Sequence, residues 1–203
     1  MRSLFYSFLL VLFASSLYGQ FKKGDVEFSF MATIDKHSER TENYPFNVSI
    51  DPVTVFYLSL NPAYYIIDGL SVEPEFSIFA NSNSKPATSL IGNVSYTYKA
   101  ESSPLAVYAR AGYGFSNGYY YPAVRGVAYR ISSRFDVGIL NAGAGVKFLF
   151  GTSAVIRAEV NYKEQSSEQE YYAYSASNPY GTKKKYDQIL EDITLMVGCG
   201  LLF

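Results

Sequence analysis

The last stretch of the sequence, residues 187–203, constrains the fold most, because apolar residues recur there at every second position. The apolar parity carries Ile189, Ile193, Leu195, Val197, Cys199, Leu201 and Phe203. The other parity includes Gln188, Asp192, Thr194, Gly198 and Gly200. Alternation of this kind is typical of a strand with one apolar and one polar face. The segment therefore predicts a strand whose apolar side must leave water.

The first nineteen residues read as a secretory signal peptide. Arg2 precedes an apolar run over 4–13, and small residues follow before Gly19. The run is too short to cross a bilayer as a helix, although an N-terminal anchor is the alternative. We expect cleavage between Gly19 and Gln20, with Ser16 as a second candidate. Residues 1–19 are then the signal peptide, and 20–203 form one domain.

Charge and cysteine content exclude several classes of protein. Removing residues 1–19 takes away Arg2 and leaves 16 basic against 18 acidic residues, a net charge near −2. Such a chain has no basic footprint for nucleic acid. Cys199 is the only cysteine, so no intrachain disulfide forms, and one Cys with one His does not suggest a metal site. We expect no cofactor.

Seven further segments alternate in the same way, over 24–34, 53–67, 70–80, 88–99, 105–116, 135–150 and 154–163. Their length suits tilted membrane strands of roughly 10 residues. No apolar run after the signal peptide is long enough for a spanning helix, and a membrane protein without such runs must be a closed barrel. The sequence predicts an all-β, eight-stranded antiparallel up-and-down transmembrane β-barrel.

The connections and the aromatic residues suggest how the barrel is oriented. The connections over 35–52, 117–134 and 164–186 are long and polar, whereas Asp68-Gly69 fits a tight turn. Short periplasmic and long extracellular connections are typical of outer-membrane barrels. Both termini are then periplasmic, in a bacterial outer membrane. Aromatic belts are expected at both interfaces, formed by Tyr64, Tyr98, Phe148 and Phe203 at one end and by Phe56, Phe115 and Tyr162 at the other.

Several motifs resemble the OmpA/OmpX-like family of small outer-membrane barrels, in a style similar to that of Bacteroidetes. Residues 58–72, with Pro62 and the Asp68-Gly69 turn, look like that family's second hairpin, although Ala63 or Tyr64 replaces its usual Gly. Residues 142–148 and 156–162 resemble its sixth and seventh strands. Phe203, with Leu201, resembles the C-terminal signal that the barrel-assembly machinery reads. The resemblance implies outer-membrane lipid and lipopolysaccharide as surroundings.

The polar faces of the strands place charged residues inside a narrow barrel. An eight-stranded barrel is only wide enough for its side chains to fill it, so a general porin is not expected. The inward parity carries Glu27 and Asp192, together with a predicted charge network of Glu73, Glu75, Arg110, Lys147, Arg157 and Glu159. Buried charges must pair, and Arg110 and Lys147 are candidate partners for Glu73 and Glu75. The resemblance implies a structural plug; an ion path is the alternative.

For function, the sequence favours a non-enzymatic role, either structural or in surface interaction, over catalysis. Tyrosines gather in two connections, and we expect them to contact a surface or host protein: Tyr119, Tyr120, Tyr121, Tyr171, Tyr172 and Tyr174. A lipid-modifying enzyme is one alternative, but adjacent His37 and Ser38 on an extended chain cannot converge as a triad requires. The other alternative is a secreted lipocalin-like barrel, with its apolar parity inward and its charges in water.

Overall fold

The computed structural model describes residues 21–37, 40–41, 48–49, 53–81, 86–101, 103–118, 136–150, 153–175 and 178–203. The signal-peptide prediction and Tyr119, Tyr120 and Tyr121 lie outside these residues, as do Ser38, Gly19 and Gln20. In this part of the chain, no helix has the length and apolar character needed to span a bilayer.

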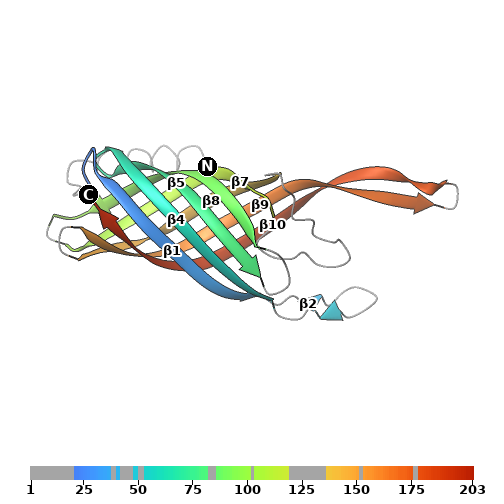
Figure 1. The fold of residues 1–203 in the computed structure, drawn as a ribbon, viewed down its shortest axis with the longest axis horizontal. Coiled ribbons are helices and arrows are strands. Elements are labelled where there is room, and N and C mark those ends of the chain that lie inside the picture. Colours follow the sequence, from blue (N-terminus) through green and yellow to red (C-terminus); the bar gives the residue numbers. More distant parts are fainter. Residues whose placement is uncertain are drawn as a thin grey trace, which may run out of the picture.

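Eight strands close into one antiparallel barrel (Figure 1). They are β1 (Val26–His37), β4 (Val53–Ile67), β5 (Leu70–Asn81), β6 (Ala87–Lys99), β7 (Leu105–Ser116), β8 (Val137–Phe150), β9 (Ala154–Ser175) and β10 (Asn178–Leu202). Each strand pairs with its neighbour in sequence, and β10 pairs with β1 to close the ring. Two further strands, β2 (Arg40–Thr41) and β3 (Val48–Ser49), pair only with each other. The predicted fold class is confirmed.

The two faces of the wall differ in the way that the alternation predicts. Apolar side chains such as Phe28, Val94 and Leu195 are exposed on the outside. Polar and charged side chains, among them Glu73 and Arg157, are buried inside. The lipocalin-like alternative required the reverse arrangement, and the structure contradicts it.

The turn between β4 and β5 lies at Asp68-Gly69, as expected. Gly69 has a φ of 76°, a conformation that glycine adopts at little cost. Its amide donates to the carbonyl oxygen of Phe21 at 2.8 Å, and its own carbonyl oxygen accepts from Thr97 at 2.8 Å. The turn therefore also connects the N-terminal segment to β6.

The connection predicted over 164–186 is wrong, because most of it is strand. β9 continues to Ser175 and β10 begins at Asn178, and the two stay paired along this extension. β8 accompanies β9 only as far as Ser166. Past that residue the two strands form a ribbon without other neighbours, which projects beyond the barrel in Figure 1. We call this part, residues 167–188, the ribbon.

Candidate functional site: the charged interior

The interior of the barrel holds four carboxylates and four cations that contact one another. Strand alternation points them inward from five strands: Glu27 from β1, Glu73 and Glu75 from β5, Arg110 from β7, Lys147 from β8, and Arg157, Glu159 and Lys163 from β9. All eight are buried. Their formal charges cancel, which is what a narrow, poorly hydrated space requires, because an isolated buried charge is costly.

Arg110 lies at the centre of this network. Its Nη1 atom is 2.7 Å from Oε2 of Glu75 and 3.0 Å from Oε1 of Glu73. Its Nε and Nη2 atoms both donate to Oε1 of Glu159, at 3.0 Å and 2.8 Å. One guanidinium thus joins three carboxylates from two strands. A planar, five-donor group suits this position, whereas a lysine ammonium would not span the same set of acceptors.

Toward the chain termini, Arg157 and Lys147 share Glu27. Lys147 Nζ donates to Oε2 of Glu27 at 2.7 Å. Arg157 Nη1 lies 3.5 Å from Oε1 of the same carboxylate, and Nη2 donates to Oε1 of Glu73 at 3.1 Å. The guanidinium of Arg157 also lies 4.8 Å from the ring centroid of Tyr108. Arg157 therefore links the Glu27 pair to the Arg110 centre.

Toward the ribbon, Lys163 completes the network. Its Nζ donates to Oε1 of Glu75 at 2.9 Å and to the Tyr57 hydroxyl at 2.6 Å. The Tyr57 hydroxyl in turn donates to the same carboxylate. Glu75 is thereby shared between Arg110 on one side and Lys163 on the other. The ion pairs form one continuous chain along the barrel axis.

An aromatic plug closes the interior at the end where Phe21 and Phe203 lie. Phe21, which precedes β1, is fully buried, and its ring stacks on Tyr65 with a centroid distance of 5.4 Å. Ala106, Val155 and Leu202 surround the two rings. The Gly24 amide donates to the Tyr65 carbonyl oxygen at 2.8 Å, which fixes the N-terminal segment across this end.

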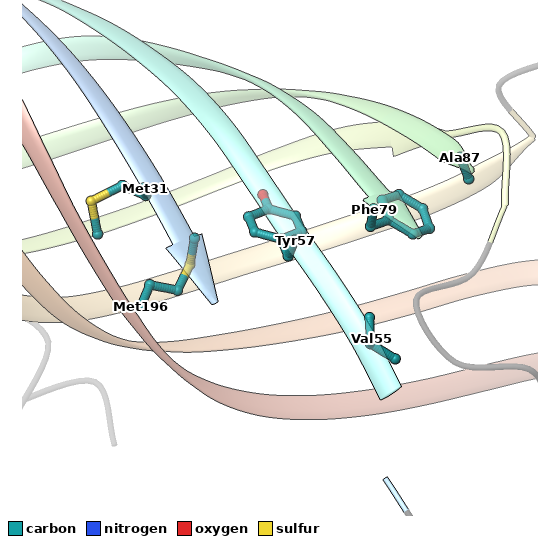
Figure 2. Close-up of a cluster of buried hydrophobic side chains, with 6 residues drawn as sticks. All are labelled: Met31, Val55, Tyr57, Phe79, Ala87 and Met196. Atoms are coloured by element: carbon teal, nitrogen blue, oxygen red, sulfur yellow. The ribbon is translucent and has the colours of Figure 1, made fainter. Parts of the chain in front are cut away.

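An apolar cluster lies between the charges and the ribbon end. Figure 2 shows its members, Met31, Val55, Tyr57, Phe79, Ala87 and Met196, which come from β1, β4, β5, β6 and β10. In the described part of the barrel, the charged layer is thus enclosed between two apolar layers. Such an interior is suited to holding the strands together.

The six predicted network residues all lie in this interior, but one predicted partner differs. Arg110 contacts Glu73 and Glu75 as expected, whereas Lys147 pairs with Glu27. Lys163 was not among the predicted network residues, because it stood at the expected end of its strand. Lys163 has the same parity as the inward-facing Arg157, and this alternation is the sequence signal that places it inside the barrel.

The predicted terminal residues close the barrel. The Phe203 amide donates to the Val26 carbonyl oxygen at 2.8 Å, and the Val26 amide donates back at 3.0 Å. The Phe203 ring is 69% exposed and meets Phe28 edge to face, with centroids 6.4 Å apart. Leu201 is exposed on the same outer face. Tyr171, Tyr172 and Tyr174 lie in strand β9 within the ribbon, where a loop was expected.

A closed eight-stranded antiparallel barrel, apolar outside and charged within, is the architecture of the small transmembrane barrels. Among the solved structures that resemble this chain in fold are three outer-membrane or surface proteins. The N-terminal β-barrel domain of Pseudomonas aeruginosa OprF is 14% identical, with 89% of this chain and 98% of that one covered and a TM-score of 0.52. The outer membrane protein OprG of the same organism is 14% identical, with 90% of this chain and 97% of that one covered and a TM-score of 0.51. Neisserial surface protein A is also 14% identical, with 88% of this chain and 97% of that one covered and a TM-score of 0.53. No protein-family model and no curated protein matches the sequence.

Proposed function

We propose that the protein is an integral outer-membrane barrel that contacts a partner at the cell surface and carries out no chemistry of its own. The apolar band around the barrel supports a position in a bilayer, because lipid is the solvent that such a surface needs. The fold shared with outer-membrane barrels supports the same location. The ribbon and long connections are then extracellular, and both termini are periplasmic.

The observation that carries the surface role is the ribbon. A two-stranded ribbon is marginally stable alone, so its projection from a barrel suggests that something else contacts it. Its register places Tyr171 opposite Lys184 and Tyr172 opposite Lys183. Tyrosine offers a large contact area with few rotamers to freeze. Lysines beside these tyrosines suit a partner with acidic or phosphate groups, such as a surface or host protein or lipopolysaccharide.

The test replaces the Tyr clusters with alanine in the full chain, at 119–121 and at Tyr171, Tyr172 and Tyr174. Binding of expressing cells to host cells or matrix should be lost, while the amount of assembled barrel is unchanged. Replacing Ser166, Ser167 and Ser175 with alanine on the same strand is the matched control and should leave binding intact. Unchanged binding in the Tyr variant would contradict the assignment.

A further inference from the structure

The barrel wall is split between β1 and β10 on the side of the ribbon. The ladder that joins these two strands ends at the pair Ala32–Val197. Past this pair, β1 continues to pair with β4 as far as His37. On the other side, β10 continues to pair with β9 from Met196 back to Thr182. Each strand therefore keeps its other neighbour, while β1 and β10 do not pair with each other past Ala32–Val197. We call this opening the split seam.

The outer edges of the split seam carry unusually exposed apolar side chains. Ile34 is 73% exposed, Ile193 70% and Leu195 64%. On strands with neighbours on both sides, the more exposed outward residues, Val94, Val160 and Tyr113, reach 54–56%. The difference arises because no adjacent strand covers the seam side of Ile34, Ile193 and Leu195. An apolar molecule that lies along the seam can bury the additional surface.

The inner edges of the split seam are polar and partly open. A cavity of about 10 Å³ lies there, lined by Thr33, Asp35, Val55, Tyr57, Lys163, Asp192 and Thr194. This is the volume of one water-sized group. Thr33 and Thr194 are half-buried, whereas the inward residues Ile91 and Ile139 on closed parts of the wall are fully buried. The seam thus offers hydrogen-bonding groups at a point that the surroundings can reach.

The depth of the seam matches the boundary between headgroups and acyl chains. Ile34 pairs with Phe56, and Ile193 pairs with Tyr162. These two aromatic residues belong to the belt expected at the ribbon end. Aromatic belts lie at the headgroup level of a bilayer. A lipid beside the seam would therefore have its polar end near the cavity and its chain along the lower wall.

We propose that the split seam binds one lipid of the surrounding leaflet, with an acyl chain along Ile34, Ile193 and Leu195 and a single headgroup oxygen in the cavity lined by Thr33 and Thr194. Hydrocarbon alone cannot hydrogen-bond the hydroxyl groups of Thr33 and Thr194. Water alone would leave the exposed apolar flanks uncovered. A lipid supplies both kinds of contact. The inference rests on the proposed membrane location and is independent of any surface partner.

The experiment measures lipid retained by the full mature chain after reconstitution. A Cys199→Ser variant is inserted into vesicles of phosphatidylethanolamine and phosphatidylglycerol and then extracted into mild detergent. Native mass spectrometry measures the mass of the protein together with any bound lipid. Thr33→Cys and Met196→Cys are then added to this variant, at the first positions past Ala32–Val197, the last pair between β1 and β10. Their disulfide closes the seam, and the reduced form of the same protein is the matched control. Retained lipid should fall several-fold on oxidation and return on reduction to the level of a Thr33→Cys single variant, which lacks the same hydroxyl group.

A second variant does not depend on disulfide formation. Thr33→Val with Thr194→Val keeps the shape of the cavity and removes two hydroxyl groups, so lipid retention should fall several-fold. Thr88→Val, on the closed part of the wall, should retain lipid like the parent. Equal retention in the oxidised and reduced forms, a parent without bound lipid, or a second copy of the chain at the seam would each overturn the proposal. Failure to enter vesicles would instead contradict the membrane location.

Discussion

Arg110 and Glu75 lie 35 residues apart in sequence, yet Nη1 of Arg110 is 2.7 Å from Oε2 of Glu75. Neither side chain is exposed. The same guanidinium holds Glu73 and Glu159. Three carboxylates from two strands therefore share one cation from a third strand. The charged layer ties together parts of the wall that are not adjacent in the sheet.

Loss of Arg110 should be strongly destabilising. Arg110→Leu leaves three buried carboxylates without their shared cation, and breaking a buried ion pair in this way costs about 3–5 kcal/mol. Denaturant unfolding of the purified barrel, followed by circular dichroism, measures the loss. Lys23→Leu, at an exposed position, is the control and should change the free energy of unfolding by less than about 0.5 kcal/mol. Equal stability of the two variants would rule out a structural role for the network.

The alternation of residues predicts the strands and the face of each side chain, but not the contacts between distant strands. Parity alone places Lys147 and Arg157 inside. It does not say that both reach Glu27, because that depends on the stagger of each strand around the closed barrel. Lys147 was accordingly assigned the wrong carboxylates. Pairing inside a barrel is a property of the whole ring.

The ribbon shows a second limit of sequence patterns. Residues 164–186 have no apolar parity, because a ribbon that projects beyond the barrel has no core in which to bury an apolar face. Its pairing comes from the backbone bonds between β9 and β10, which polar sequences make as well as apolar ones. Phe21 was missed for a related reason. It precedes the alternating segment, and nothing in the local pattern shows that it turns into the barrel.

Replacing Phe21 should weaken the plug at the terminal end of the barrel. Phe21→Ala removes a fully buried ring that stacks on Tyr65, and such a substitution costs about 3–5 kcal/mol in a closed core. The same unfolding assay measures it. Phe28→Ala removes a ring of the same size from the outer face, where detergent replaces the contact, and should cost less. The plug is refuted if Phe28→Ala proves as costly as Phe21→Ala.

Deletion of Phe203 should lower the assembled fraction of the protein in cells. The deletion removes the C-terminal aromatic residue and both backbone hydrogen bonds that join it to Val26 at the start of β1. The measurement is the amount of folded barrel recovered from membranes. Phe150→Ala, which removes another exposed outer ring, should assemble normally. Normal assembly without Phe203 would contradict the terminal-signal interpretation.

The proposed orientation predicts where a protease can act on intact cells. Lys183, Lys184 and Lys185 lie in the ribbon, so trypsin added outside should cut there. Lys22 and Lys23 are exposed at the other end of the barrel, and should be cut only after the outer membrane is permeabilised. Mass spectrometry of the fragments distinguishes the two sites. Cleavage at Lys22 or Lys23 in intact cells would reverse the orientation.

The central claim is that the apolar face of every strand meets lipid and the polar face lines the interior. Spin labels placed singly at Asn93, Val94, Ser95 and Tyr96 of β6, in the Cys199→Ser background and in vesicles, test it directly. Collisions with oxygen, which concentrates in hydrocarbon, should be frequent at Val94 and Tyr96 and rare at Asn93 and Ser95. The account is contradicted if Val94 and Tyr96 are sheltered from oxygen while Asn93 and Ser95 collide freely with a water-soluble nickel complex.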